Sequence, residues 1–587
     1  MSFIKKLPVL TIILLGIKCH ATSTEDTPKV VLHQGTITGS RHTLGKGGHY
    51  FAFRSIPYAQ PPVGELRFRD PIPAGNWSQA RNGSVVPPQC PQLNLASLAK
   101  GKLEIVGTED CLYINIYTPK LSGSDLPVMM FIHGGAFQVG SVRDTSPAPL
   151  LEEESVVVVT FHYRLGTLGF LSTEDSVLPG NLGLKDQTLA LLWVKNNIRA
   201  FGGDPGRVTL FGPNAGGVSA HLQTIVPSAA DLVSGGILQS GTALSPWAFR
   251  KDHRRVAAEV AKLLNCSGTA TDANSDLDSA ALLRCLQETK LERLVVLPKN
   301  FIEWSNEPIL MVPRVDGEYI PDNPATLLKQ NLTNKANLIT GINAHDGAIT
   351  SLFVYHRDDL RQALIENFTR IGPLVLNFRD GDENPEYLAR RAFHHYLGDF
   401  TITPAKADAL TKLFTDRLFS TSSDRVALLQ AGSASTDVHK VYTYELRHLG
   451  QYKYLPTFGA RLAEKWITYG DELQYLFDSV SGRMPLERPA DLMLRHIMVK
   501  LWTNFAATGN PTPDQSLGFR WSPATKDSLR HLILKPDASM GDDERVKIRA
   551  FWDELPTVQN KILFPEKFHP GSSPQPVEPF GSCLEGR

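Results

Sequence analysis

The residues Gly212-Pro213-Asn214-Ala215-Gly216-Gly217 have the outline of a catalytic turn between a strand and a helix. They follow the apolar run Arg207–Phe211 and precede the helix-compatible run Val218–Thr224. In the pattern G-x-S-x-G, such a turn lifts a serine nucleophile above a sheet, and small neighbours let strand and helix pass closely. Here the central residue is Asn214, and asparagine is among the few non-glycine residues that tolerate positive φ. The sequence therefore predicts a preserved turn that carries a carboxamide instead of a hydroxyl.

Nine segments in order make the chain resemble the type-B carboxylesterase/cholinesterase family. They are Phe53–Phe68, Glu109–Pro119 (EDCLYINIYTP), His133–Phe137, Tyr163–Leu171, Gly180–Gln187, Phe201–Pro205, Gly212–Gly217, Gln239–Ala248 and Trp502–Pro511. One departure is Ser55, where the family usually has glycine. The resemblance implies an α/β-hydrolase fold, with a large, mostly parallel central sheet, helices on both faces and long insertions. It also implies an oxyanion loop at His133–Phe137, with backbone N–H groups of Gly134, Gly135 and Ala215.

The same resemblance assigns the other two positions of a catalytic triad. The acid falls on Asp346, and the histidine position, just before Gly470–Phe477 (GDELQYLF), holds Tyr469. A carboxamide is not a useful nucleophile, and a phenol with a reference pKa near 10 is a poor base at neutral pH. We therefore expect the triad positions Asn214, Asp346 and Tyr469 to lack hydrolytic chemistry. We also expect the Tyr469 hydroxyl to donate a hydrogen bond to Asp346.

Four nearby side chains offer alternatives to this interpretation. Ser219 should lie inside the helix and point away from the turn, and Ser240 belongs to a segment that supports the site in the family without attacking substrate. His345 and His448 could replace the missing base, but such histidines are more often structural. A sequence error could remove one serine but does not explain the separate loss of the histidine. The sequence thus favours a pseudoenzyme.

The elements that must position these residues follow from apolar runs. Leu126–His133 and Ser155–Tyr163 are nearly continuous apolar segments, which is typical of strands covered on both faces of a parallel sheet. Further candidate strands are Arg207–Phe211, Gly236–Leu238, Asn337–Thr340 and Val441–Tyr444. Helical patterns between them predict a doubly wound α/β domain. One such domain over residues 22–563 accounts for most of the 587 residues.

Both ends of the chain have a composition of their own. Residues 1–21 resemble a signal peptide, with Lys5, Lys6 and an apolar run from Leu7 to Ile17 that is too short to cross a bilayer. An amphipathic or buried N-terminal helix is the alternative. No later run is long enough to span a membrane, so we expect a secreted protein without a membrane span. Residues 564–587 form a Pro-rich tail.

Charge and cysteine content limit the partners. Sixty basic and sixty acidic residues give zero net charge, which argues against nucleic acid. Neighbours in sequence suggest the disulfides Cys90–Cys111 and Cys266–Cys285. Cys583 is left over, as a free thiol or as a bridge within a homodimer. No cysteine pair has zinc-ligand spacing, so we expect neither a metal nor another cofactor. Sequons predict glycosylation at Asn76, Asn82, Asn265, Asn331 and Asn367.

Three functions fit these observations. The favoured one is a secreted, catalytically inactive protein that binds an extracellular protein partner, as the resemblance to glutactin- and neurotactin-like adhesion proteins implies. The second is a non-catalytic carrier that holds an apolar ligand in the family's substrate gorge. The third is an active carboxylic ester hydrolase that uses a non-standard site.

Overall fold

The computed structural model describes residues 27–568, except 99–100, 122, 144, 153–154, 270–276, 335, 380, 434–438, 455–463 and 479–483. The predicted signal peptide, Cys583 and the predicted tail beyond Phe568 lie outside these residues.

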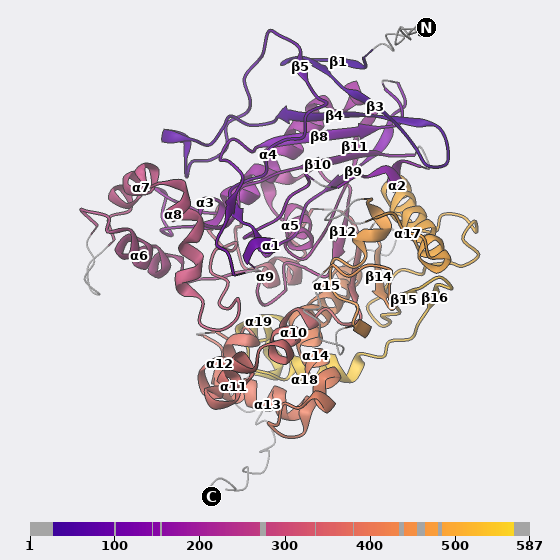
Figure 1. Cartoon of the computed structure of the whole chain (residues 1–587). Helices are drawn as coiled ribbons and strands as arrows, with labels where there is room; N and C mark the ends of the chain where they lie inside the picture. Colours follow the sequence, from indigo (N-terminus) through magenta and orange to yellow (C-terminus); the bar gives the residue numbers. More distant parts are fainter. Residues whose placement is uncertain are drawn as a thin grey trace, which may run out of the picture.

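An eleven-stranded mixed sheet runs through the described chain in the order β16-β15-β14-β13-β12-β11-β9-β10-β8-β4-β3 (Figure 1). Neighbouring strands from β10 to β15 pair in parallel, and antiparallel strands extend the sheet at both edges. The strands are β3 (Ser40–Thr43), β4 (His49–Pro57), β8 (Tyr113–Thr118), β9 (Leu126–Phe131), β10 (Val157–Phe161), β11 (Gly203–Pro213), β12 (Gly235–Gln239), β13 (Asn337–Asn343), β14 (Val441–Leu446), β15 (Leu532–Leu534) and β16 (Ser539–Met540).

Two small sheets accompany it. One contains β1 (Lys29–Leu32), β2 (Gly35–Thr38) and β5 (Arg81–Asn82), and the other pairs β6 (Gln92–Leu93) with β7 (Ile105–Val106).

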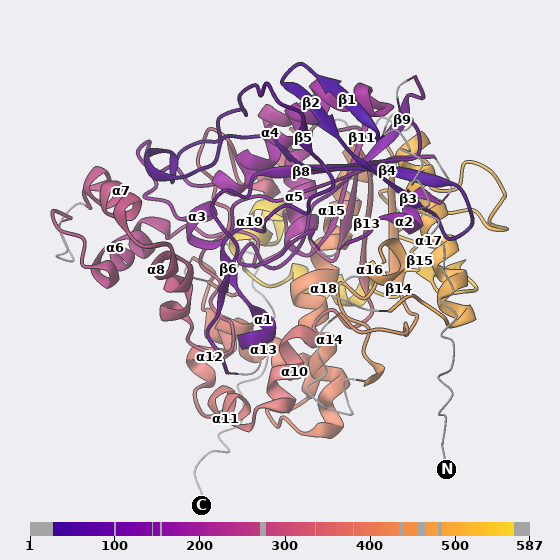
Figure 2. The same ribbon diagram turned by 45° about the horizontal axis from the view of Figure 1, so that its top comes forward.

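Helices cover both faces of the large sheet. In the first half of the chain they are α1 (Leu95–Leu98), α2 (Ala148–Leu151), α3 (Gly166–Phe170), α4 (Leu182–Asn197), α5 (Ala215–Gln223), α6 (His253–Leu264), α7 (Ser279–Glu288) and α8 (Leu291–Val296). In the second half they are α9 (Pro324–Lys329), α10 (Ala348–His356), α11 (Asp358–Glu366), α12 (Phe368–Val375), α13 (Pro385–Leu397), α14 (Ala407–Thr415), α15 (Thr421–Ser433), α16 (Leu473–Leu476), α17 (Pro489–Thr508), α18 (Val546–Asp553) and α19 (Val558–Leu563). Figures 1 and 2 both show α6–α8 gathered on one flank and α10–α14 on another.

Burial on both faces explains the continuous apolar runs of the central strands. In β9, Val128 and Met130 belong to one hydrophobic cluster together with residues of α4 and α5. Met129 and Phe131 alternate with them and belong to a second cluster together with residues of α17. The six predicted strands are present as β9 to β14, and the predicted α/β-hydrolase fold class is confirmed.

This topology brings distant loops to one edge of the sheet. Because β9, β11, β12 and β13 run parallel, the residues after their carboxyl ends lie along the same side. These residues include His133–Phe137, Asn214, Ser240 and Asp346. The segment with Tyr469 joins them through a backbone hydrogen bond from His345 N–H to the Ile467 carbonyl, at 2.9 Å.

Candidate functional site

The turn at Asn214 has the backbone that the sequence predicts. Asn214 stands between the end of β11 and the start of α5 with φ 55° and ψ −118°. Its N–H donates to the Gln239 carbonyl at 2.8 Å, which ties the turn to the neighbouring strand. A Cβ atom on either Gly212 or Gly216 would lie 2.0 Å from the Ile132 carbonyl oxygen. Glycine is therefore required at both positions for the strand, the helix and the next loop to approach.

The loop after β9 contacts the Asn214 side chain directly. Ala136 has φ 53°, and its backbone N–H donates to Asn214 Oδ1 at 3.0 Å. The N–H groups expected to form the oxyanion loop are those of Gly134, Gly135 and Ala215, and Ala136, which directly follows the two glycines, adds a further one. A Cβ atom on Gly134 would lie 2.5 Å from the Pro213 carbonyl oxygen, so Gly134 packs against the turn itself. Gly135 lines the adjoining cavity beside Ala136.

Asp346 is fully buried behind this turn. Its Oδ2 accepts the Asn343 backbone N–H at 3.1 Å, and its Oδ1 has no hydrogen-bond partner among the described residues. Burial raises the pKa of Asp346 well above its usual value, while the nearby Ser240 hydroxyl lowers the pKa and the Glu472 carboxyl raises it. Asp346 is therefore a carboxyl group that burial drives toward its protonated form.

Glu472 is a second buried carboxyl group beside Asp346. Its two oxygens accept hydrogen bonds from Gln239 Nε2 at 3.0 Å and from Asn343 Nδ2 at 2.6 Å. Burial raises the pKa of Glu472 to about 7, partly offset by the Asn343 hydrogen bond. No feature of the sequence distinguishes this residue as a site residue, although it lies within the segment Gly470–Phe477.

Tyr469 lies beside the cavity, and the predicted hydrogen bond to Asp346 is wrong. None of the hydrogen bonds among the described residues joins the two side chains, and Asp346 Oδ1 remains without a donor. The Tyr469 ring packs against Tyr454 with 5.6 Å between ring centroids, and the residue lines the same cavity as Asn214. Burial also raises the pKa of Tyr469. The phenol thus keeps its proton at neutral pH and cannot act as a base there.

The side chains that could replace the nucleophile or the base either have hydrogen-bond partners or are buried. Ser219 Oγ accepts a hydrogen bond from Gln187 Nε2 at 3.0 Å inside the core, and Ser240 is completely buried. His345 Nδ1 accepts the Ile467 N–H at 3.2 Å, and His448 Nε2 lies 2.8 Å from Asp491 Oδ1. Each of the two histidines therefore has a hydrogen-bond partner away from Asn214.

A cavity of about 610 Å³ opens in front of Asn214 and Tyr469. Its walls are mainly apolar and come from α1, α3, α8 and α10, including Leu294 and Phe353, and from other segments that supply Trp247, Leu418 and Phe419. This volume falls within the range of ligand pockets, about 300–1,000 Å³. A second cavity of about 520 Å³ shares part of its wall, including Glu307 and Asn377.

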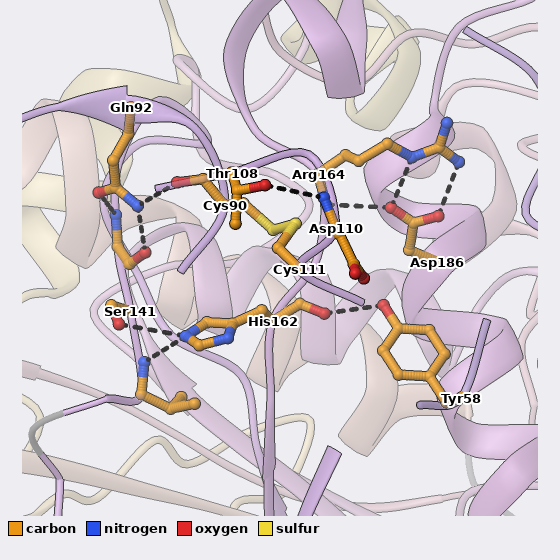
Figure 3. The surroundings of a disulfide bond; sticks show 12 residues. Tyr58, Cys90, Gln92, Thr108, Asp110, Cys111, Ser141, His162, Arg164 and Asp186 are labelled. Atoms are coloured by element: carbon orange, nitrogen blue, oxygen red, sulfur yellow. Dashed lines mark hydrogen bonds and ion pairs between the residues drawn. A yellow bond between two sulfur atoms is a disulfide. The ribbon is translucent and has the colours of Figure 1, made fainter. Parts of the chain in front are cut away.

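Both predicted disulfides are present, Cys90–Cys111 and Cys266–Cys285. Figure 3 shows the first of them with Gln92 nearby. Gln92 Nε2 donates to the Cys90 and Gly140 carbonyls, at 3.0 and 2.8 Å, and Gln92 Oε1 accepts the Gly140 N–H at 2.8 Å. The disulfide therefore lies in a segment that is hydrogen-bonded to the chain just beyond the Ala136 loop.

The surface of the described chain is compatible with the predicted glycosylation sites. All five sequon asparagines are exposed: Asn76, Asn82, Asn265, Asn331 and Asn367. Within the described ranges, none of the helices is both long and apolar enough to cross a membrane. The same ranges contain no group of three or more His, Cys, Asp or Glu side chains that could hold a metal ion.

The mixed eleven-stranded sheet, together with the strained turn between β11 and α5, defines an α/β hydrolase. The model of the carboxylesterase family matches residues 26–552, and the chain belongs to that family.

Relatives named as esterases share its length. A carboxylic ester hydrolase of Bombus ignitus is 32% identical over 95% of this chain and 99% of its own. The juvenile hormone esterase of Tribolium castaneum is 34% identical over 84% of this chain and 86% of its own. The cocaine esterase of Oryctolagus cuniculus is 32% identical over 92% of this chain and 98% of its own.

Proposed function

We propose that this protein is a secreted, non-hydrolytic member of the carboxylesterase family that binds an apolar ester in the cavity before Asn214. The observation that carries the proposal is the hydrogen bond from Ala136 N–H to Asn214 Oδ1 at the base of an open cavity. The hydrogen bond supports the loss of turnover, and the cavity at the same place supports the retention of ligand binding.

Loss of turnover follows from the chemistry of the side chains at the site. Acyl transfer needs a hydroxyl or thiol nucleophile and a base that removes its proton. Asn214 supplies neither group, and the buried Tyr469 phenol has a raised pKa. The Asn214 amide oxygen also occupies the Ala136 N–H, which an oxyanion would otherwise use.

Retention of binding follows from the cavity. Its apolar walls favour hydrophobic ligands, because removal of apolar surface from water contributes about 25 cal/mol per Å². The relatives are named for ester substrates, including juvenile hormone, so an ester is the ligand class that we propose. The cavity moves our preference from the protein-interaction role, which rests on resemblance alone, to the carrier role.

A turnover assay tests the first part of the proposal. Purified protein should not hydrolyse a chromogenic short-chain ester above background, and it should form no covalent adduct with an organophosphate. The Tribolium juvenile hormone esterase serves as the positive control. Turnover that disappears in a Leu418→Trp variant, which would fill the cavity, would establish the active-hydrolase alternative.

Ligand extraction tests the second part. Protein collected from the medium of expressing cells should begin after Ala21 and should release an apolar ester that mass spectrometry detects. Leu418→Trp should release much less. A secreted protein that carries no apolar molecule, and that binds neither juvenile hormone nor simple alkyl esters, would favour the protein-interaction role.

A further inference from the structure

The orientation of the Asn214 amide is set by its neighbour. A backbone N–H can only donate, so the Ala136 N–H must face the amide oxygen, as it does at 3.0 Å. A flipped amide would place two donors against each other. The Nδ2 group therefore points elsewhere than to Ala136, and no hydrogen bond joins it to another of the described residues.

This Nδ2 group belongs to a side chain that lines the cavity. Asn214 is only 5% exposed, yet it contributes to the cavity wall together with Ala136 and Tyr469. A ligand acceptor that replaces water at this donor contributes a modest net gain of about 0.5–1.5 kcal/mol for the hydrogen bond. The turn that would carry a nucleophile thus offers a hydrogen-bond donor.

The Tyr469 hydroxyl is a second donor on a residue that lines the same cavity. It has no hydrogen-bond partner among the described residues, and burial keeps it protonated. The neighbouring acids, Asp346 and Glu472, lie fully buried behind the wall. A ligand carboxylate bound here would lose its hydration close to these two carboxyl groups, whereas a neutral carbonyl oxygen would meet two neutral donors.

We propose that Asn214 Nδ2 and the Tyr469 hydroxyl together bind the carbonyl oxygen of an intact, uncharged ester whose apolar part fills the cavity. This inference rests on the proposed function and adds the polar contact that selects the ligand. It assigns Asn214 a role in recognition. The site prefers esters and ketones to hydrocarbons, ethers or free fatty acids of the same length.

Matched ligands test the inference. Methyl dodecanoate, methyl dodecyl ether and dodecanoate compete with an environment-sensitive apolar dye for the wild-type protein. The ester should bind about tenfold more tightly than the ether or the acid, because two hydrogen bonds of modest net strength favour it.

Two variants then separate recognition from packing. Asn214→Asp keeps an acceptor for the Ala136 N–H but replaces the amide donor, and Tyr469→Phe removes only the hydroxyl. Each should weaken ester binding between about twofold and tenfold and leave ether binding unchanged. Leu294→Ala, a change in the apolar wall, is the control and should weaken both ligands alike. Cooperative thermal unfolding confirms that each variant is folded. If Asn214→Asp does not fold, Tyr469→Phe alone tests the inference.

The outcomes separate this inference from the function on which it rests. If ester and ether bind equally to the wild type, or if neither donor variant changes their ratio, the inference is wrong while the carrier function stands. If no apolar ligand displaces the dye, or if the ester is hydrolysed, the proposed function fails and the inference fails with it.

Discussion

At Asn214, one carboxamide holds a loop and faces a cavity at the same time. Its oxygen accepts the Ala136 N–H, and its nitrogen is left for a ligand. A serine hydroxyl at this position would be shorter and would release the Ala136 N–H. The same substitution that supplies a nucleophile would therefore also restore a donor to the oxyanion loop.

We predict that Asn214→Ser together with Tyr469→His restores measurable ester hydrolysis, whereas neither single substitution does. Nucleophile and base act as a unit, so the loss of either one costs on the order of 10⁶ in turnover and the losses do not add. Chromogenic ester turnover and organophosphate labelling of residue 214 are the measurements. A folded, inert double variant would show that the acid or the cavity geometry no longer supports acyl transfer.

A second prediction at the residue scale concerns Glu307, which lines both cavities. Burial raises the pKa of Glu307 from 4.5 to about 7, despite the Ile309 N–H and the charges of Arg379 and Arg250. Between these values the native state keeps a proton that the unfolded chain releases. The free energy of unfolding should therefore fall as pH rises from about 4.5 to about 7, by at most about 3 kcal/mol for this residue.

Chemical denaturation of wild type and Glu307→Gln at several pH values measures this effect. The free energy of unfolding should depend less steeply on pH in the variant, and the variant should be more stable than the wild type above pH 7. Glu472, with a pKa of about 7, retains its own share of the slope. Glu366→Gln, at an exposed position on α11, is the matched control. An unchanged slope in Glu307→Gln would contradict the prediction.

At the scale of elements, the two disulfides differ in what they hold. They close loops of similar sequence separation, 21 and 19 residues. Cys90 directly precedes Pro91, Gln92 and Leu93, which line the cavity. Cys266–Cys285 instead connects the segment after α6 to α7 on the flank. The first disulfide thus supports a cavity wall and the second a peripheral pair of helices.

We predict that Cys90→Ser/Cys111→Ser and Cys266→Ser/Cys285→Ser each lower the free energy of unfolding by about 3 kcal/mol. Only the first double variant should also weaken binding of an apolar ester. Denaturation curves and dye displacement on the same preparations compare the two. Equal loss of ligand binding in both would show that the Cys90 segment does not shape the cavity.

The sequence predicts the elements better than the contacts between them. The strands β9 to β14 and the turn at Asn214 follow from local patterns of apolar residues and glycine. The Ala136 hydrogen bond joins residues 78 positions apart, so it depends on how two parallel strands place their loops. The position of Tyr469 depends on packing against Tyr454 and on the burial of Asp346, and the expected bond between Tyr469 and Asp346 is therefore absent.

At the scale of the whole molecule, a buried ion network holds the start of helix α18 against the sheet. Asp424 in α15 accepts from Arg545 Nη2 at 2.7 Å and from Arg549 Nη1 at 2.9 Å. Arg545 also donates to Glu445 in β14 at 2.6 Å. Burial alone would raise the pKa of Asp424, but the charges of the two arginines lower it to about 2.

We predict that Asp424→Asn lowers the free energy of unfolding by about 3–5 kcal/mol, because it leaves two buried arginines without their shared counter-charge. Asp125→Asn breaks an ion pair with Arg199, in which both side chains are about two-thirds exposed, and should cost less than about 1 kcal/mol. Urea denaturation at pH 7 compares the variants. Similar losses in both would contradict the role of the buried network.

The close approach at the turn between β11 and α5 also bears on how such proteins evolve. The Ile132 carbonyl fills the space that a side chain on Gly212 or Gly216 would need, whereas the side chain of residue 214 takes no part in that approach. Selection can therefore exchange the reactive group at position 214 in one step, among residues that tolerate positive φ, while both glycines stay fixed. An identity of 32% over nearly the whole chain therefore shows that the fold is inherited, but it does not determine which side chain the fold carries at position 214.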